Sequence, residues 1–496
     1  MEKGTFISLL GLLPLASVDL YAQQKPNVLF IFADDMTYNC MGDIGPDELH
    51  TPNLDELRGN GMYFTHAFNQ GGWNGAISVA SRSMLVTGRY LWKAKEVVSD
   101  KAKVTDVDAF RPLFWPQYMK QAGYDTYMTG KWHVAVDAHK VFDVARHVRG
   151  GMPRQTQAGY AASTKNPQGR KFVEGEADAW QPYKEEYGGY WEGGRHWSEV
   201  VGDDAVDYIR TAEEQDDPFF MYIAFNAPHD PRQSPKRFVD MYPVDRISIP
   251  ENFQPLYPYY REIGCGEGLR DEQLAPFPRT EYSVKVNRQE YYAIISHMDE
   301  QIGRILDALK ESGKYDNTYI IFSADHGLAV GDHGLIGKQN MYDASMRVPL
   351  IICGPGVKKG RCEELVYLQD AMATAMDIAG SSHLDTVDFK SLLPLARKER
   401  KAESLCAEEA VYGAYINLQR MVRTDRYKLV LYLKNNVVRL YDLKKDPHEM
   451  NDLAGKAKYR KIADELFGIL LSKQLEVGDE VDVKAAYEAY WANKQE

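Results

Sequence analysis

Acidic side chains follow two apolar segments of this sequence. "PNVLFIFADD" ends in Asp34 and Asp35, and "NTYIIFSADHG" contains Asp325 and His326. A continuous apolar run is typical of a strand buried on both faces of a sheet. Carboxylates that converge at one sheet edge repel one another unless a cation binds them. One acid pair alone fits a helix cap or a solvated turn better. Two pairs in equivalent places favour a site for Ca²⁺ or Mg²⁺, although histidine is a softer ligand than these ions usually have.

Basic side chains occur in three other short segments. "TGKWHVA" contains Lys131 and His133, "NAPHDP" contains His229, and "HGLIGKQNMYDASMRVPL" contains Lys338. Each residue alone can be a solvated lysine or a histidine bonded to the backbone. Together beside a metal they would form a cationic pocket suited to a tetrahedral oxyanion. The sequence leaves open whether they meet.

A serine segment without a local base raises a different question. "GAISVASRSMLVTG" contains Ser78 and Arg82 but no acid or histidine. A serine hydroxyl needs an adjacent base or another form of activation to act as a nucleophile. If Ser78 is catalytic, its chemistry depends on residues elsewhere in the chain.

The serine segment carries a resemblance to a known family. "SVASRSMLVTGR" resembles the signature of formylglycine-dependent sulfatases, C/S-x-P/A-S-R followed by an apolar pair and T-G-R. Further blocks resemble the family in the family's order, and together they span roughly residues 25 to 455: "PNVLFIFADD", "TPNLDELRGNGMYFTHAF", "TGKWH", "APHDP", "SADHGLAVGDHGLIGKQNMYDASMRVPL" and "LYDLKKDPHEMNDLA". An ordered set is more specific than one short motif. The sequence is most similar to serine-type bacterial glycan sulfatases of the alkaline-phosphatase-like superfamily.

The resemblance implies that Ser78 is not used as encoded. A maturation enzyme would oxidise it to formylglycine (3-oxoalanine), whose hydrated form is a gem-diol. One hydroxyl would attack the sulfur, and the other would then expel sulfate, which is a release route that a plain serine ester lacks. A serine-type motif further implies a radical-type, oxygen-independent maturation enzyme and therefore an anaerobic bacterial host.

The resemblance also implies a role for each candidate residue. The metal ligands would be Asp34, Asp35, Ser78, Asp325 and His326. Arg82 would fix the gem-diol, and Lys131 and Lys338 would hold the sulfate charge. His133 would take the proton when the sulfated adduct breaks down, and His229 would protonate the departing sugar oxygen as a general acid.

Two positions depart from the family's usual pattern. Ala80 stands where many members have proline, which bears on how efficiently the serine is modified. His326 stands where many members have asparagine, which makes it the least secure member of the predicted ligand set.

Strands that alternate with helical patterns predict an α/β fold. We expect an alkaline-phosphatase-like, mostly parallel sheet sandwiched by helices, with "VPLIICGPG" (348–356) as a fourth buried strand. An apolar stripe at helical spacing predicts a helix over 286–313. Residues 25–385 would form the catalytic domain. Residues 386–496 would form a smaller subdomain of antiparallel strands, around a "KNN" turn, plus a helix. The segment 140–200 is expected to form insertion loops.

The N-terminus and the composition indicate an exported protein. Residues 1–22 have the pattern of a signal peptide, and Pro14 weighs against a buried first helix. The predicted location is therefore the periplasm or cell surface, with no other membrane span. The net charge of -12 argues against a nucleic-acid partner. Five scattered cysteines predict neither a disulfide framework nor a zinc site, although Cys353 and Cys362 are close enough in sequence to bridge.

The predicted reaction is hydrolysis of a sulfate ester on a sulfated carbohydrate, with a 2-O-sulfated uronic acid of a glycosaminoglycan as the first expectation. The aromatic segment 181–197 would either stack on the sugar or pack on the domain. Two alternatives remain. One is a phosphate mono- or diesterase of the same superfamily, although phosphatases of this fold usually hold two metals. The other is a glycan-binding relative without catalytic activity.

Overall fold

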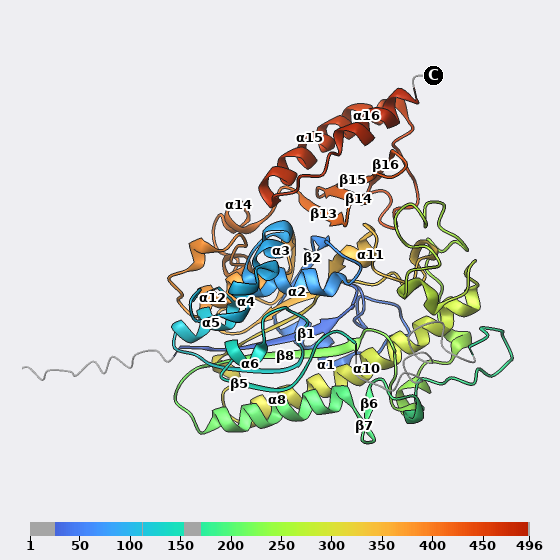
Figure 1. The fold of residues 1–496 in the computed structure, drawn as a ribbon. Helices are drawn as coiled ribbons and strands as arrows, with labels where there is room; N and C mark the ends of the chain where they lie inside the picture. Colours follow the sequence, from blue (N-terminus) through green and yellow to red (C-terminus); the bar gives the residue numbers. More distant parts are fainter. Residues whose placement is uncertain (1–24, 112, 153–169, 495–496) are drawn as a thin grey trace, which may run out of the picture.

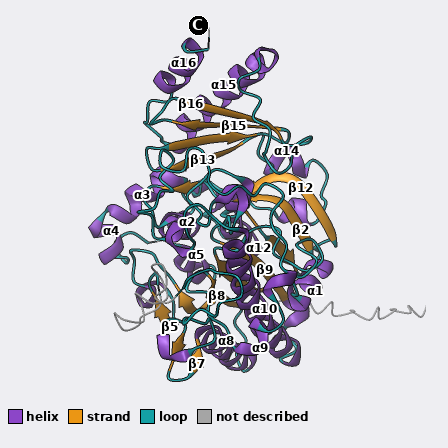
Figure 2. Cartoon of the chain, turned by 90° about the vertical axis from the view of Figure 1, so that its right-hand side faces the viewer, coloured by secondary structure: helices purple, strands orange, loops and turns teal. Residues whose placement is uncertain are grey.

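A computed structural model describes residues 25–111, 113–152 and 170–494, so the predicted signal peptide over 1–22 lies outside it. Within the described residues the chain forms a nine-stranded mixed sheet and a separate five-stranded sheet. Helices cover both faces of the large sheet, and the small sheet lies at one end of the molecule (Figures 1 and 2). This arrangement confirms the predicted α/β fold class.

The large sheet is parallel at its centre. Its strands run in the order β5 (Val144–Arg149), β4 (Asp125–Lys131), β8 (Phe219–Pro228), β1 (Asn27–Asp34), β9 (Thr318–Ala324), β11 (Leu350–Cys353), β2 (Met62–Phe68) and β10 (Arg347–Val348), and β12 (Gly360–Tyr367) pairs with β2. The first five strands in this order pair in parallel. The predicted apolar strands therefore lie side by side and point the same way.

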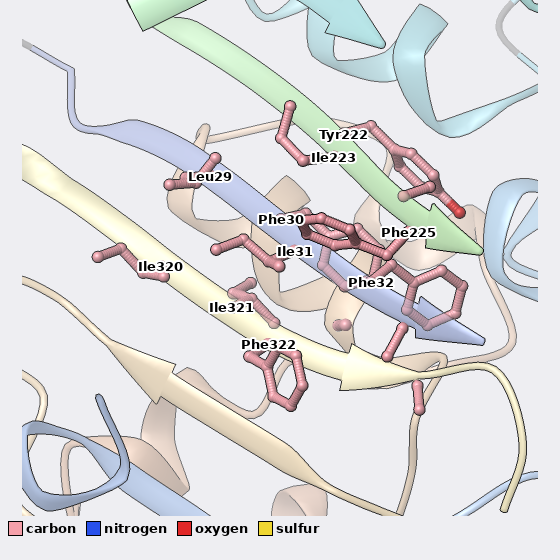
Figure 3. Close-up of a cluster of buried hydrophobic side chains, with 14 of the residues drawn as sticks. Leu29, Phe30, Ile31, Phe32, Tyr222, Ile223, Phe225, Ile320, Ile321 and Phe322 are labelled. Atoms are coloured by element: carbon pink, nitrogen blue, oxygen red, sulfur yellow. The ribbon is translucent and has the colours of Figure 1, made fainter. Parts of the chain in front are cut away.

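The apolar run of β1 explains its central place. Every residue of β1 is buried. Ile31 lies between Ile223 of β8 and Phe322 of β9 in the strand register, and these side chains fill the core shown in Figure 3. The ring centroids of Phe30 and Tyr222 are 5.1 Å apart. A strand buried on both faces must be apolar throughout, and this sequence meets that condition.

Two groups of helices enclose the sheet (Figure 1). On one side are α1 (Pro52–Asn60), α8 (Trp197–Glu213) and α10 (Glu281–Glu311); on the other are α2 (Ile77–Thr87), α5 (Trp115–Gln121) and α12 (Asp370–Ile378). The predicted long helix is α10, which begins after the cap residue Thr280. Its predicted apolar stripe is buried. Gly313, with φ +71°, follows its end.

The remaining elements are short. They are α3 (Leu91–Ser99), α4 (Lys101–Thr105), α6 (Ala138–Val141), α9 (Lys236–Val239), α11 (Asp343–Met346), α13 (Leu393–Ala396), α14 (Ala402–Cys406), β6 (Trp191–Glu192) and β7 (Arg195–His196). The segment 140–200, predicted as loops, therefore contributes an edge strand, β5, and a small hairpin, β6–β7, to the fold.

One predicted strand runs in the opposite direction from its neighbours. The apolar pattern predicts a strand over 348–356 without fixing its direction, and β11 pairs antiparallel with both β9 and β2. The chain between β9 and β11 stays at the edge of the sheet where β9 ends. Without a crossover helix, the next strand has to run back. The sheet is therefore mixed rather than wholly parallel.

The small sheet includes a piece of the N-terminal half. Its order is β16 (Val437–Asp442), β15 (Tyr427–Tyr432), β14 (Gln419–Arg423), β13 (Val411–Tyr415) and β3 (Gly71–Gly72), and α15 (Arg460–Val477) and α16 (Lys484–Ala492) pack on it. β15 and β16 flank the predicted "KNN" turn. At Gly71 a Cβ atom would lie 2.0 Å from the carbonyl oxygen of Ala414. Only glycine therefore permits this pairing.

A buried ion network joins the two sheets. The Nζ atom of Lys428, on β15, donates to Asp343 Oδ1 at 2.5 Å, to Glu449 Oε1 at 2.6 Å and to the Met341 carbonyl at 3.1 Å. Lys428 and both acids are buried. Burial alone would raise the pKa of Asp343, but Lys428 and Arg423 hold it well below its usual range.

All five cysteines lie in the described residues, and none is in a disulfide. Cys353 and Cys362 lie on strands that flank β2, so the bridge left open by their spacing is absent. In the described part of the chain, no helix combines the length and the apolarity that crossing a bilayer requires.

We expect Lys428→Met to destabilise the protein by about 3–5 kcal/mol, because it leaves the buried Glu449 without its cation and removes one of the cations around Asp343. Urea unfolding would measure the loss. The control is Lys444→Met on the same sheet, because Lys444 is an exposed partner of Asp425 at 2.8 Å and its loss should cost less than about 1 kcal/mol. Equal effects of the two substitutions would contradict this account.

Candidate active site

The residues predicted to bind the metal or to take part in catalysis lie at one edge of the large sheet. Asp34 ends β1, Lys131 ends β4, His229 follows β8, and Asp325 and His326 follow β9. These four strands are parallel, so their carboxyl ends share an edge, where α/β folds bind ligands. The sheet therefore brings together residues that are far apart in sequence.

A cavity of about 300 Å³ opens at this edge. Five of the predicted residues line it: Ser78, Lys131, His133, His229 and Lys338. The other lining residues are Gly75, Ala76, Gly151, Met152, Leu269, Arg270, Asp271 and Gln339. A larger cavity of about 410 Å³ contains none of the predicted residues in its lining. The smaller cavity is therefore the candidate site.

Helix α2 presents Ser78 and Arg82 to the acids. The two residues are one turn apart and share a face of the helix, with Ser78 in its first turn. Ser78 Oγ donates to Asp34 Oδ1 at 3.2 Å, and Ser78 is only 2% exposed. Arg82 Nε donates to Asp325 Oδ2 at 2.9 Å, and Nη1 donates to the Lys131 carbonyl at 2.7 Å. Arg82 thereby ties the helix to two strand ends.

The buried carboxylates differ in their proton affinity. Burial and the neighbouring Asp325 raise the pKa of Asp34 to about 6. Burial likewise raises the pKa of Asp35, although Lys338 Nζ donates to its Oδ1 at 2.6 Å. Burial would also raise the pKa of Asp325, but Arg82 and Lys131 hold it well below its usual range. Burial therefore dominates at Asp34 and Asp35, and nearby cations dominate at Asp325.

Lysine ammonium groups lie directly on two of the acids. Lys131 forms an ion pair with Asp34, and Lys338 forms one with Asp35. Lys131 follows Gly130, whose φ is +93° and where a Cβ atom would lie 1.9 Å from the Ala224 carbonyl oxygen. Only glycine allows β4 to approach β8 this closely. The close pairing brings Lys131 to the acids.

His133 is a neutral base in this environment. Burial lowers its pKa to about 3, and the positive charge of Lys131 contributes. Its Nδ1 atom is buried and has no hydrogen-bond partner among the described residues. Its backbone has φ +55°, a left-handed conformation that is strained for this residue type. A neutral imidazole with a free nitrogen can accept a proton.

The backbone of Asp230 orients His229. The Nδ1 atom of His229 lies 2.7 Å from the Asp230 carbonyl, and Nε2 lies 3.4 Å from Asp35 Oδ2. Burial lowers the pKa of His229 well below its usual range, and Lys338 adds to the effect. The carbonyl contact assigns the proton to Nδ1, so Nε2 of the neutral ring is an acceptor. Proton donation from Nε2 therefore requires the imidazolium, which the contact with the Asp230 carbonyl favours.

The aromatic segment 181–197 packs on the protein. None of its residues, all of which the structure describes, lines the 300 Å³ cavity. The hydroxyl of Tyr190 donates to the carbonyls of Asn226, at 2.6 Å, and of His229, at 3.0 Å. Of the two roles left open by the sequence, the structure supports packing, which here holds the backbone of His229 in place.

The acids fit a divalent cation. Ligand atoms of Asp34, Asp35 and His229 lie within 4.8 Å of one another. The predicted ligand His326 has its Nδ1 2.9 Å from the Gly327 carbonyl, and its buried Nε2 has no partner in the described part of the chain. A histidine fixed through one nitrogen and free at the other is arranged like a metal ligand. Several carboxylate oxygens suit a hard cation.

One segment that braces the site was not predicted from the sequence. In "LRDEQL", Arg270 donates to Asp230 Oδ1 at 3.1 Å, Asp271 Oδ2 accepts from Gln339 at 2.8 Å, and Glu272 Oε1 accepts from the Gly337 amide at 2.8 Å. The three consecutive residues thus support the segments that carry His229 and Lys338. Nothing in their spacing resembles a catalytic motif, so no local pattern marks them.

Two family models match the chain. The sequence model of the family described as Sulfatase matches residues 26–381, and that of the N-sulphoglucosamine sulphohydrolase C-terminal domain matches residues 331–476. An arylsulfatase of Clostridium perfringens is 28% identical, over 92% of this chain and 95% of its own. An N-acetylglucosamine-6-O-sulfatase of Bacteroides thetaiotaomicron is 24% identical, over 94% of this chain and 91% of its own.

Two solved structures share the fold. A protein in complex with its substrate D-glucosamine-2-N,6-O-disulfate has a TM-score of 0.69 at 22% identity, covering 92% of this chain and 99% of that one. A phosphonate monoester hydrolase of Silicibacter pomeroyi has a TM-score of 0.70 at 20% identity, covering 92% and 96%. At these identities the likeness shows the fold alone.

We expect Glu272→Gln to loosen the segment that carries Lys338. The neutral amide binds the Ile336 and Gly337 amides less well and places a donor against Arg279, so stability should fall by about 1–3 kcal/mol. Hydrogen exchange at the two amides should quicken. The control is Glu267→Gln, an exposed partner of Arg261 whose loss should cost less than about 0.5 kcal/mol. Unchanged exchange in the Glu272 variant would contradict the bracing role.

Proposed function

Because the chain belongs to the sulfatase family and is a sulfuric ester hydrolase, we propose that it hydrolyses a sulfate ester on a glycan through a formylglycine made from Ser78 and a bound divalent cation. One observation carries the proposal. The Ser78 hydroxyl lies 3.2 Å from Asp34 in a cavity that two lysines and two histidines also line. A nucleophile, an anion-binding group and proton carriers therefore surround one small volume.

The metal would be held by the acids at the strand ends, by His326 and by the oxygen of residue 78. These ligands are Asp34, Asp35, Ser78, Asp325 and His326, and the ion would be Ca²⁺ or Mg²⁺. Such an ion lowers the pKa of a bound oxygen nucleophile and neutralises sulfate oxygens. His229, although close to Asp34 and Asp35, is assigned to proton transfer because it lines the cavity where a leaving group would sit.

The cationic side chains would bind and orient the ester. Lys131 and Lys338 line the same cavity as Ser78. Each would exchange part of its contact with a carboxylate for contact with a sulfate oxygen once the cation neutralises the acids. Arg82, fully buried and held by Asp325, would fix the hydrated aldehyde at position 78. That aldehyde supplies a gem-diol nucleophile with its own release route.

The two histidines would move protons in opposite directions. The neutral His133, with its free buried nitrogen, would accept the proton released at residue 78 when sulfate departs. His229 would donate to the sugar oxygen from Nε2, as an imidazolium whose Nδ1 lies 3.2 Å from the Asp230 carboxylate. A poor leaving group such as a sugar alkoxide needs this proton.

The substrate and the cellular setting are further parts of the proposal. The sulfated glucosamines named for two similar proteins support a glycan substrate. The 2-O-sulfated uronic acid expected from the sequence is untested, and the cavity wall described in the next subsection favours a neutral sugar in its place. The radical-type maturation enzyme, the export signal over 1–22, the periplasmic or cell-surface location and the division into catalytic domain (25–385) and subdomain (386–496) stay predictions.

We expect Ser78→Ala to abolish hydrolysis of 4-nitrophenyl sulfate by protein produced with a maturation enzyme, a loss of more than about 1,000-fold. Urea unfolding should change little, because Ser78 makes a single hydrogen bond. The control is Ser83→Ala: Ser83 is buried on the same helix, and its hydroxyl has no partner in the described residues. Retained turnover in Ser78→Ala would refute the proposed nucleophile.

The same assay tests the two alternative functions. The wild-type protein should hydrolyse 4-nitrophenyl sulfate faster than 4-nitrophenyl phosphate; the reverse order would favour the phosphoesterase. Mass spectrometry should show Ser78 converted to formylglycine. An unmodified serine in protein that binds glycans without turnover would favour the binding protein.

Calcium should raise the unfolding temperature of the metal-free protein. An ion that binds only the folded state stabilises it by about 2.7 kcal/mol at about 100 times its dissociation constant. Thermal unfolding with calcium and with a chelator measures the effect. His326→Ala should reduce the increase, and the matched variant His229→Ala should keep it. The opposite pattern would replace His326 with His229 in the ligand set.

A further inference from the structure

The wall of the cavity beside His229 suggests which sugar it accepts. Leu269, Arg270, Asp271 and Gln339 line this wall together with the sulfate-side residues. Building on the proposed function, we propose that the substrate is a sulfate monoester of a neutral pyranose unit whose hydroxyls contact Arg270 and Asp271, rather than of a uronic acid or a sugar with a second sulfate. The contacts, charge and size of this wall each favour such a ligand.

Arg270 is held in place by two acids. Its guanidinium donates to both carboxylate oxygens of Asp230 and to Asp271 Oδ1, the latter at 2.5 Å. Its Nε donates to no group in the described part of the chain, and 22% of the side chain is exposed, against 6% and 7% for the two acids. Arg270 therefore lines the cavity as a fixed hydrogen-bond donor, and Asp230 and Asp271 already neutralise its charge.

Asp271 and Gln339 complete a wall that offers both hydrogen-bond donors and hydrogen-bond acceptors. Asp271 accepts from Arg270 and Gln339, one bond to each carboxylate oxygen, so each oxygen keeps further acceptor capacity. A sugar hydroxyl is a donor and an acceptor at once. A guanidinium beside a carboxylate matches neighbouring hydroxyls on both counts, whereas a carboxylate or sulfate group can only accept.

The acids of this wall disfavour a second anion. A uronate or a second sulfate would bring a negative charge close to Asp230 and Asp271, which are 6% and 7% exposed. Like charges brought together in a poorly hydrated site oppose binding strongly. Arg270 does not offset this charge, because two acids already share it.

The size of the cavity limits the ligand to about one sugar unit. Its volume of about 300 Å³ is at the lower end of the range of about 300–1,000 Å³ for small-molecule sites. A monosaccharide sulfate, free or at the end of a chain, suits this volume better than an internal unit with sugars on both sides. The wall at Arg270 and Asp271 would then contact hydroxyls of the same ring that carries the sulfate.

A panel of matched substrates tests the inference with the wild-type enzyme. Neutral hexoses and N-acetylhexosamines, sulfated singly at each position, are each compared with a partner that adds one anion, a uronic acid or an N-sulfate. At least one neutral member should be hydrolysed, with kcat/KM about 10-fold or more above its anionic partner. 4-Nitrophenyl sulfate serves as the reference substrate that makes no contact through sugar hydroxyls.

Two variants assign the preference to this wall. Arg270→Lys keeps the positive charge but loses the planar guanidinium that donates several hydrogen bonds at once. We therefore expect kcat/KM for the neutral sugar sulfate to fall by about 10- to 100-fold, and kcat/KM for 4-nitrophenyl sulfate to fall by less. Asp271→Asn removes one negative charge and should raise kcat/KM for the anionic partner substrate relative to kcat/KM for the neutral sugar sulfate. A general folding defect would not shift the two substrates in opposite directions. The control is Arg261→Met, because Arg261 is an exposed residue of the same loop outside the cavity lining. This substitution should leave unchanged the kcat/KM of the neutral sugar sulfate relative to its anionic partner and relative to 4-nitrophenyl sulfate.

The outcomes separate this inference from the proposed function. No hydrolysis of 4-nitrophenyl sulfate by the matured enzyme would refute the function itself. Hydrolysis of 4-nitrophenyl sulfate together with a preference for the uronic acid or N-sulfated partners, or with no neutral sugar hydrolysed, would overturn the inference alone. Equal losses on all substrates in Arg270→Lys would assign Arg270 to holding Asp230 and would also overturn it.

Discussion

Compensation of buried charge is the constraint on which this structure depends. Two neighbouring parallel strands deliver carboxylates to one sheet edge, where Asp34, Asp35 and Asp325 are almost fully buried. Such groups are tolerated only when cations and donors surround them. The lysines at 131 and 338 meet that need and also line the cavity, where they would bind an anion. Changing either lysine would therefore affect the stability of the protein and the proposed chemistry together.

The small sheet contributes to the site through its connections. Lys428 anchors the segment that begins just after Lys338, and Glu272 binds the backbone just before it. The residue that would hold the sulfate is thus fixed from both sides, once by the small sheet and once by the loop before α10. Relatives whose C-terminal region resembles this one would be expected to keep such a connection, because a loosely held lysine binds an anion poorly.

Sequence reasoning identified the fold class and five of the residues that line the candidate cavity, because several motifs in a fixed order are far more specific than any one of them. It left the direction of the strand after β9 open, because direction depends on whether a crossover helix intervenes, which residue periodicity does not encode. It also missed Arg270 and Glu272. Their roles depend on contacts with Asp230 and with backbone amides distant in sequence, and an ion pair of this kind leaves no local pattern.

The short strand at Gly71–Gly72 has a consequence for how the protein is made. It pairs with residues 414 and 415, and helix α2 with Ser78 begins only a few residues later. During synthesis that pairing has to wait until about 340 more residues have emerged from the ribosome. The folded protein leaves Ser78 only 2% exposed, so the proposed maturation enzyme would have to reach it before the chain closes. Late assembly of the small sheet would extend the time available for the proposed modification.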